Sequence, residues 1–284
     1  MPYVWLGLAG LILAGTVILP RRNGTALATF WVAGGIVFTA DYLVLDLLEM
    51  YHYRPGLLAG QVPDIVFGVF LAELAFVGGF ATWLVYTVPP WAGATFGTLL
   101  VVGLEVLFRR WGVFVGYSWS VWHSVVAFPP YFLLVYWFRA AAERRGIHDR
   151  WVCTLTRVNV ALWWAHFAGM VVYWMMAGLV FQIHWLPTFA RNQALGALLT
   201  VAPWMTAAML WVMAAHSHER VPRLLYASAG LLLFGLVWEG VGLWHFRAPW
   251  NVYLHTAAQV ATIYIAVRCD DWIGAWSPRA KRLL

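Results

Sequence analysis

Residues 63–87 read PDIVFGVFLAELAFVGGFATWLVYT. A helix that crosses a membrane needs about 20 mostly apolar residues, so this stretch is long enough for one span. Glu73 lies about ten residues into the stretch, or about 15 Å deep at 1.5 Å per residue, which is close to the bilayer midplane. The stretch therefore predicts a membrane helix that carries one acidic side chain at depth.

The rest of the chain has the same character. Hydrophobic residues make up 63% of the sequence and charged residues 11%, and the mean hydropathy is +0.73. Soluble domains average about 45–50% apolar and about 25% charged residues. The apolar stretches do not alternate in polarity as the strands of a membrane barrel do. We therefore expect an all-α, polytopic transmembrane helical bundle that forms one integral domain over residues 1–284, with nine spans, or eight if a terminal stretch does not cross. The predicted spans are 3–20, 26–50, 63–87, 90–108, 119–138, 155–183, 192–215, 222–245 and 250–268.

The basic residues predict the orientation, since cytoplasmic loops of membrane proteins are enriched in Lys and Arg. With the N-terminus outside, thirteen of the 18 Lys and Arg residues fall on the inner side and five on the outer side. We therefore expect a cell-membrane protein with its N-terminus outside and its C-terminus in the cytoplasm. The net charge of +6 is divided among short inner loops, so no nucleic-acid partner is expected. Cys153 and Cys269 both fall on the inner side, where a disulfide is not expected.

Two pairs of short motifs predict an internal repeat. The sequences YHYR at 51–54 and WHFR at 244–247 each begin five residues after an acid, Asp46 and Glu239. Farther along, WSVWHS at 119–124 resembles WNVYLHT at 250–256, with one extra residue. These matches indicate a parallel repeat with units 26–87, 90–138 and 222–268. Aromatic residues and Arg also gather at membrane interfaces without any repeat, which is the alternative explanation.

The stretch from Asp41 to about Trp137 resembles an uncharacterised family of small multi-spanning bacterial membrane proteins, known mostly from spore-forming bacteria. The resemblance rests on Asp46 with its aromatic turn, Glu105, Trp119, Ser124 and Phe128-Pro129, and it implies no established activity. More weakly, the order of Asp46, Tyr51-His52-Tyr53 and Glu73-Leu74-Ala75-Phe76 is similar to that in membrane-embedded lycopene cyclases, which would imply an isoprenoid substrate. The Pro-x-Glu-Glu segment of that second family is absent from this chain.

Four acidic residues are the candidate catalytic groups: Glu73, Glu239, Asp46 and Glu105. A charged side chain at the centre of a membrane helix costs about 2.5–3.5 kcal/mol on insertion scales, so such residues need partners or water. The neighbours of Glu73 one turn away are apolar, so we expect a partner from another helix, or protonation. Glu105 has Arg109 four residues later, which predicts an ion pair. Asp41 and Asp46 lie five residues apart, which at 100° per residue puts them on different helix faces.

A second set of residues is expected to line or surround the same site. On the predicted topology the acids and most histidines lie in the outer half of the bilayer, which predicts a pocket that opens outward. Arg54 and Arg247, with their aromatic neighbours, are typical of interface anchors and would form its rim. No metal-binding or cofactor motif is recognisable, so neither is expected. The candidate substrate-binding residues are His52, His245, His123, Arg54, Arg247, Asp41, Trp119 and Trp238.

Three hypotheses of function follow. The first is a cyclase- or isomerase-like enzyme that performs acid–base catalysis on a lipid or isoprenoid, with Glu73 or Glu239 as the general acid and Asp46 as the base. The second is a proton- or cation-coupled transporter. The third is a membrane assembly protein, or a haem-bearing anchor that uses His123 and His166. The expected partner is a membrane lipid or a lipid-soluble substrate, and the sequence gives no oligomeric state. The first hypothesis requires the candidate acids to converge on one cavity.

Overall fold

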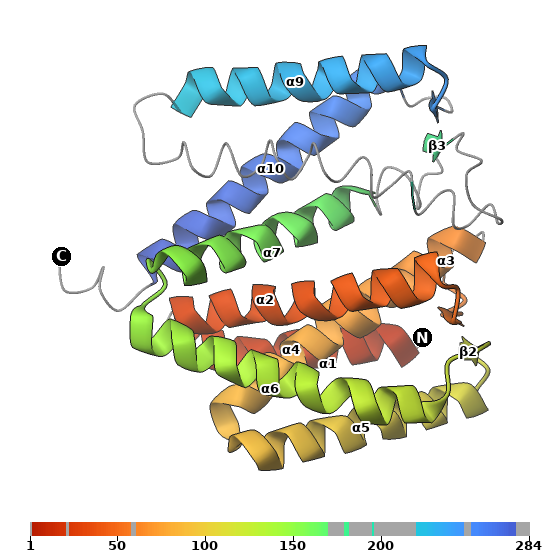
Figure 1. The fold of residues 1–284 in the computed structure, drawn as a ribbon, viewed down its shortest axis with the longest axis vertical. Coiled ribbons are helices and arrows are strands. Elements are labelled where there is room, and N and C mark those ends of the chain that lie inside the picture. Colours follow the sequence, from red (N-terminus) through yellow and green to blue (C-terminus); the bar gives the residue numbers. More distant parts are fainter. Residues whose placement is uncertain are drawn as a thin grey trace. The chain divides into compact units, whose positions relative to one another are not determined.

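The structure is a computed structural model that describes residues 2–20, 23–57, 61–169, 179–181, 195, 220–246 and 251–276. Only the backbone is described for residues 42, 46, 47, 61–63, 66, 165–169, 179–181, 220–224 and 227. The described chain is mostly helical, as the composition predicts (Figure 1). It forms two compact units, Met1–Asn159 with Trp272–Leu284, and Val160–Asp271.

The first unit is a bundle of helices closed at one end by a pair of short strands. Its elements are α1 (Pro2–Ile18), α2 (Gly24–Asp41), η1 (Tyr42–Leu47), β1 (Tyr51–Tyr53), α3 (Gln61–Val69), η2 (Phe70–Val77), α4 (Gly78–Thr87), α5 (Pro90–Arg110), β2 (Phe114–Gly116), α6 (Val121–Arg145) and the first part of α7 (Arg150–Gly169). Strand β1 pairs antiparallel with β2. The hydroxyl of Tyr3 donates to the Val113 carbonyl at 2.9 Å, which puts the start of α1 at this strand end as well.

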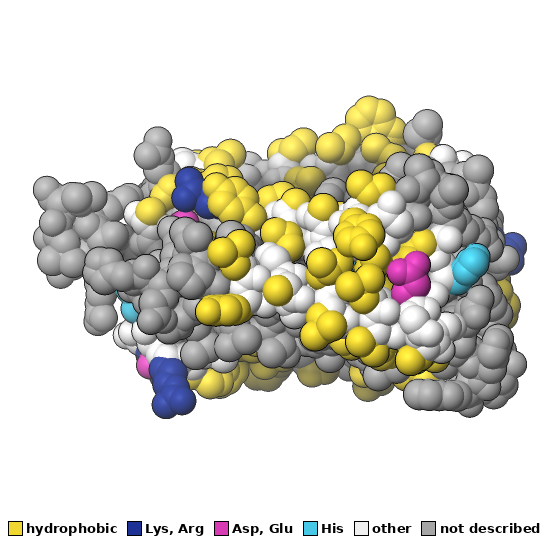
Figure 2. Space-filling model, turned by 90° about the horizontal axis from the view of Figure 1, so that it is seen from above, with side chains coloured by type: hydrophobic (Ala, Val, Ile, Leu, Met, Phe, Trp, Pro, Cys, Tyr) yellow, Lys and Arg dark blue, Asp and Glu magenta, His cyan; other side chains and the backbone are white. Residues whose placement is uncertain are grey.

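Four helical stretches in the described residues are long and apolar enough to cross a membrane: Gly24–Leu45, Phe67–Thr87, Pro90–Arg110 and Val121–Arg145. They coincide with four of the predicted spans and support a multi-pass membrane protein. Hydrophobic side chains are exposed on these helices, including Leu99 at 66% and Val126 at 72%, as expected for surfaces that face lipid. Figure 2 shows hydrophobic side chains over much of the described surface in that view, with few charges among them. The predicted spans at 155–183 and 192–215 fall largely outside the described residues.

Two π-helical segments interrupt the helices next to the strand end. In η1, backbone bonds run from Leu48 N to the Leu43 carbonyl and from Met50 N to the Val44 carbonyl, each at 3.0 Å. In η2, the cap residue Gly78 donates from its N–H to the Glu73 carbonyl five positions back. Since π-helical bonding widens the turn, the spacing of 100° per residue assumed for Asp41 and Asp46 is wrong.

Glycines let three helices of the first unit approach closely. A Cβ atom on Gly10 of α1 would lie 2.3 Å from the Ala75 carbonyl oxygen of η2, and one on Gly79 of α4 would lie 2.3 Å from the Gly10 carbonyl oxygen. A Cβ on Gly78 would lie 2.9 Å from the Gly34 Cα of α2. Small residues of this kind are common where membrane helices pack backbone to backbone. The contact holds η2 firmly between α1 and α2.

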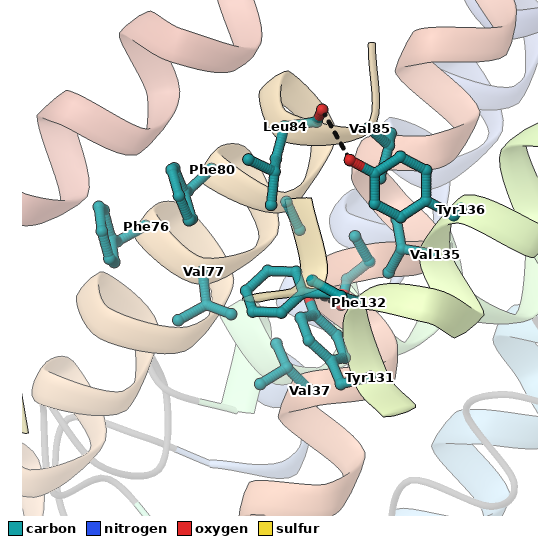
Figure 3. Close-up of a cluster of buried hydrophobic side chains, with 13 residues drawn as sticks. Val37, Phe76, Val77, Phe80, Leu84, Val85, Tyr131, Phe132, Val135 and Tyr136 are labelled. Atoms are coloured by element: carbon teal, nitrogen blue, oxygen red, sulfur yellow. Dashed lines mark hydrogen bonds between the residues drawn. The ribbon is translucent and has the colours of Figure 1, made fainter. Parts of the chain in front are cut away.

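A cluster of apolar side chains fills the interior between α2, α4, α5 and α6 (Figure 3). Leu84, Phe132 and Val135 in this cluster are 0% exposed. The hydroxyl of Tyr136 donates to the Leu84 carbonyl at 3.1 Å and to the Val88 carbonyl at 2.7 Å, which connects α6 to the end of α4. The cluster therefore closes the bundle on the side away from the strand end.

The second unit contains the rest of α7 together with β3 (Leu179–Phe181), α9 (Arg220–Gly240), β4 (Trp244–Phe246) and most of α10 (Val252–Ala275). Strand β3 pairs antiparallel with β4, with Phe181 opposite Trp244. In the first unit Tyr53 lies opposite Phe114 in the same way. The YHY and WHF motifs, which the sequence places in interface turns, thus both form three-residue strands.

Candidate functional site

A cavity of about 180 Å³ lies inside the first unit near the strand end. Its wall is mostly aromatic and aliphatic, with Tyr3, Leu6, Val37, Tyr51, Phe76, Val77, Leu104, Phe108, Phe114, Phe128 and Tyr131 among the lining residues. Three of the lining residues are acidic: Asp41 from α2, Glu73 from η2 and Glu105 from α5. An apolar cavity with a few convergent polar groups is the usual form of a small-molecule site.

Glu73 is the most isolated of the three acids. Its side chain is 6% exposed, and the Tyr53 hydroxyl donates a hydrogen bond to its Oε1 atom. The other carboxyl oxygen, Oε2, is buried and accepts no hydrogen bond from any described residue. No ion pair joins Glu73 to a Lys, Arg or His of the described chain. The sequence predicts a partner from another helix or protonation; the partner in the structure comes instead from a strand, and it is Tyr53 of β1.

Tyr53 is fixed as a donor by its surroundings. Burial first, and then the nearby Glu73 and Asp41 carboxylates, raise the pKa of the Tyr53 phenol well above its usual value, so the hydroxyl keeps its proton. The ring packs edge-on against Tyr3 at 5.6 Å and against Phe114 at 5.5 Å, measured between centroids. Because the β1–β2 pairing sets the position of Tyr53, the strand pair aims the hydroxyl at Glu73.

Glu105 is fully partnered. Arg109 donates to its Oε1 atom from Nε at 2.9 Å and from Nη2 at 2.7 Å, so the predicted ion pair is confirmed. The Ser124 hydroxyl donates to Oε2, and the Trp119 indole donates to the Ser124 oxygen at 3.0 Å. Arg109 also donates to the Trp119 carbonyl at 2.8 Å. The network ties the end of α5 to the start of α6 and neutralises the Glu105 charge.

The two aspartates of this region are Asp41 and Asp46. Asp41 is the last residue of α2, is 5% exposed and lines the cavity. Asp46 lies in η1, and its side chain falls outside the described residues. Asp41, which the sequence assigns to substrate binding, is therefore one of the three carboxyl groups at the cavity, with Glu73 and Glu105.

The other predicted rim residues of the first unit do not line the cavity, except for Trp119. His52 lies with its Nδ1 atom 3.1 Å from the Tyr117 hydroxyl. Burial lowers the pKa of His52 below its usual value, outweighing the opposite effect of Glu49. Arg54 is exposed, and exposed His123 bonds Ser120 in a capping box at the start of α6. These side chains surround the strand end.

The remaining candidates belong to the second unit. Glu239 at the end of α9 and His245 in β4 are exposed. Trp238 packs against Phe234 and Trp244, with ring centroids 5.0 and 6.1 Å apart. None of these three lines the cavity, and Arg247 and the side chain of His166 fall outside the described residues. Among the described residues no group of three His, Cys, Asp or Glu side chains could hold a metal ion.

Sequence reasoning missed Tyr53 and Ser124 as partners of the acids. The signal for Tyr53 was the alternation in YHY: side chains two apart in a strand point to the same face, and Tyr51 and Tyr53 are both buried while His52 is half-buried. For Ser124 the sequence carries no comparable signal, because Glu105 and Ser124 meet only through the α5–α6 packing.

No family model, no curated protein and no solved structure matches this chain. The two family resemblances therefore stay predictions.

Proposed function

We propose that this protein is a multi-pass membrane enzyme that performs acid–base chemistry on an apolar, lipid-soluble substrate, with Glu73 as the proton donor. One observation carries the proposal. Glu73 lies on an apolar cavity, one of its oxygens is bound by Tyr53, and the other accepts no hydrogen bond from a described residue. A buried carboxyl group without a cationic partner is favoured in its neutral, protonated form. Glu73 is thus suited to donate a proton.

The reaction that suits the aromatic and acidic lining of this cavity is redox-neutral. Glu73 protonates a carbon–carbon double bond, and the electron pair of that bond forms the new C–H bond. The positive charge left on the neighbouring carbon is stabilised by the aromatic faces of the cavity. Asp41 then removes a proton from an adjacent carbon, whose C–H electrons form a new double bond. Asp46 is the alternative base, as the sequence predicts. The net result is an isomerisation, or a cyclisation if a second double bond attacks the cation first.

The size of the cavity limits what it holds. The volume is about 180 Å³. We propose that the cavity takes the reacting end of an isoprenoid chain and that the remainder extends into the bilayer.

The test is deuterium transfer. The purified full chain in lipid nanodiscs is incubated in D₂O with a panel of unsaturated polyprenyl lipids, and deuterium in the recovered lipids is measured by mass spectrometry. We expect incorporation with the wild type and its loss in Glu73→Gln. Glu239→Gln is the matched control and should keep wild-type incorporation. Equal incorporation by wild type and Glu73→Gln would remove Glu73 from the mechanism.

A proton- or cation-coupled carrier is the second candidate, favoured by the three acids around one cavity, of which Glu105 is ion-paired with Arg109. Against it, the buried cluster around Leu84 and Phe132 fills the bundle beneath the cavity, where a path through the unit would have to run. A flux assay in proteoliposomes separates the two: uptake driven by a pH gradient, lost in Glu73→Gln, supports the carrier.

For the membrane topology we propose nine spans with the N-terminus and the strand end of the first unit outside. The proposal rests on the distribution of Lys and Arg along the sequence. In a cysteine-free background, Tyr117→Cys at the strand end should react with a membrane-impermeant maleimide in intact cells. Glu143→Cys near the other end of α6 should react only after permeabilisation. The reverse pattern would invert the topology.

We also propose that the chain contains a tandem repeat at an offset of 130 residues. The turn after α5 has bonds from Gly112 N to the Arg109 carbonyl and from Val113 N to the Phe108 carbonyl, each at 3.1 Å. The turn after α9 has the same two bonds 130 positions later, from Gly242 to Glu239 and from Leu243 to Trp238, at 3.0 and 2.9 Å. The match of 119–124 to 250–256 begins one residue farther along, since Trp119 and Trp250 are 131 positions apart.

The offset of 130 gives Glu239 a different counterpart from the one the motifs indicate. Glu239 then corresponds to Arg109, and the counterpart of Glu105 is Gly235. One further residue of offset aligns Ser124 with His255. On this proposal the second unit lacks the acid that α5 contributes to the cavity, which is why Glu239 serves as the control above.

A further inference from the structure

The far end of α6 carries a second recess, separate from the cavity. Trp137, Ala141, Arg144, Arg145 and Trp151 line it. The rings of Trp137 and Trp151 meet edge to face with centroids 4.9 Å apart, and they are 50% and 38% exposed. No acidic side chain is among the lining residues, so two guanidinium groups give the recess a charge of about +2.

The arginines of this recess differ from their neighbour one turn before. Arg139 is paired with Glu143 at 2.9 Å, and its guanidinium lies over the Tyr86 ring at 4.4 Å. Within the described part of the chain, Arg144 bonds only the Ala140 carbonyl, through Nε at 3.1 Å, and neither Arg144 nor Arg145 forms an ion pair. The nearby Asp149 caps α7 by accepting from the N–H groups of Trp151 and Val152. Both guanidinium groups therefore have N–H donors left for an anion.

An apolar stripe on α6 leads to these arginines. Val126, Leu134 and Trp137 are 72%, 41% and 50% exposed. At 100° per residue they lie on one side of the helix together with Arg144 and Arg145. The helix is long and apolar enough to span a membrane, with the arginines in its last turn. A ligand that fits this stripe has an anionic head at the membrane surface and an apolar tail along the helix.

We infer that this recess binds the phosphate head of an anionic phospholipid, with one acyl chain along the α6 stripe. Arg presents its donors in a planar fork that fits phosphate oxygens. Tryptophan is favoured at the level of lipid head groups, so Trp137 and Trp151 fit the walls of such a site. Basic pockets beside membrane helices are a recognised form of lipid head-group site. The inference does not depend on the proposed enzymatic activity.

The test measures thermal unfolding of the full chain in detergent while lipid is titrated. We expect phosphatidylglycerol to raise the unfolding temperature and phosphatidylcholine to raise it much less. The double variant Arg144→Gln/Arg145→Gln should bind phosphatidylglycerol about ten-fold more weakly or worse, the loss expected for charge-assisted hydrogen bonds. Arg110→Gln, which removes one exposed charge at the opposite end of the bundle, is the control and should keep the wild-type response.

Two further arms identify the source of the phosphate. Glycerol phosphate and inorganic phosphate, which lack acyl chains, should not reproduce the shift. A full shift with inorganic phosphate alone would overturn the lipid assignment. An unchanged phosphatidylglycerol response in the double variant would overturn the site. Native mass spectrometry provides a second readout, in which the double variant should lose one bound phosphatidylglycerol.

Discussion

Glu73 and Glu105 line the same cavity but differ in how many hydrogen bonds their carboxyl groups accept. Glu105 receives two bonds from Arg109 and one from Ser124, so it is an ion-paired structural link. Glu73 receives one bond, from a neutral phenol, and is left with a buried oxygen that accepts no hydrogen bond from a described residue. In the proposed mechanism Glu73 is therefore the proton donor, and Tyr53 is the residue that holds its carboxyl group in place.

Removing the Tyr53 hydroxyl tests this dependence. Tyr53→Phe leaves the ring in place but takes away the donor to Glu73, so a second carboxyl oxygen becomes buried without a partner. We expect the free energy of unfolding to fall by about 1–3 kcal/mol, and deuterium transfer to fall with it. Tyr51→Phe is the control in the same strand, because Tyr51 is also buried there but the hydroxyl bonded to Glu73 is that of Tyr53. Denaturant unfolding of both variants measures the loss. Equal losses in the free energy of unfolding would contradict the role of Tyr53.

His52 should give the strand end a pH-dependent stability. Its folded pKa lies below the usual 6.5, because burial and Arg54 outweigh the opposing Glu49. The folded state then binds fewer protons than the unfolded state, so stability is complete above about pH 6.5 and falls as the pH drops toward the folded pKa. His52→Gln removes the titrating group. Its unfolding temperature should change less between pH 7.5 and about pH 5.5 than that of the wild type, and an identical slope would exclude His52.

Much at the residue scale could be predicted from sequence, and the exceptions have physical causes. The Glu105–Arg109 pair follows from spacing on one helix, and a partner for Glu73 on another element follows from its apolar neighbours. The identity of that partner, Tyr53, depends on the pairing of β1 with β2 across a long stretch of chain. Side-chain contacts made by such pairing leave only an alternation pattern in the sequence.

At the scale of elements, the apolar stretches predict the helices but not their local winding. The segments 26–50 and 63–87 are helical over most of their length, yet each contains a π-helical section beside the cavity. Hydrophobic content does not distinguish π from α winding, so the faces assigned to Asp41 and Asp46 were calculated from the wrong period. The turn between η1 and β1 contains a strained backbone position. Glu49 has a φ angle of 51°, a conformation that is uncommon outside glycine.

The packing of α1 on η2 depends on a glycine. In Gly10→Ala the new Cβ would lie 2.3 Å from the Ala75 carbonyl oxygen, a backbone atom that cannot move without shifting η2. We expect a loss of about 1–3 kcal/mol in the free energy of unfolding, as for overpacked cores, and reduced activity because η2 carries Glu73. Gly15→Ala on the same helix is the matched control. Its Cβ would meet only the Leu19 side chain at 3.7 Å, and it should be neutral or slightly stabilising.

Denaturant unfolding of Gly10→Ala and Gly15→Ala measures the two free energies of unfolding. Similar stability of Gly10→Ala and wild type would mean that α1 and η2 can move apart freely, so that α1 would not fix the position of Glu73.

At the scale of the whole molecule, the proposed repeat at an offset of 130 residues would relate the two units through their sequences. The sequences YHY and WHF form strands β1 and β4, but β1 corresponds to β3 when the two strand pairs are aligned by register. The repeated motif at an offset of 193 therefore compares different members of the two pairs. The match of 119–124 to 250–256, whose first residues are 131 apart, follows the turns after α5 and α9 and so favours pairing these two turns.

The two turns provide the sharpest test of this equivalence. Gly112 and Gly242 have φ values of +70° and +74°, and a Cβ on either would meet no described atom within 4 Å. Substitution by Ala therefore adds only backbone strain, of about 1–2 kcal/mol, and the two variants should lose stability by similar amounts. Their effects on deuterium transfer should differ, since Gly112 precedes Val113 and Phe114 beside the cavity, whereas Gly242 follows α9 of the second unit. Equal loss of deuterium transfer in the two variants would show that the second unit takes part in the chemistry. Unequal losses in the free energy of unfolding would contradict the repeat.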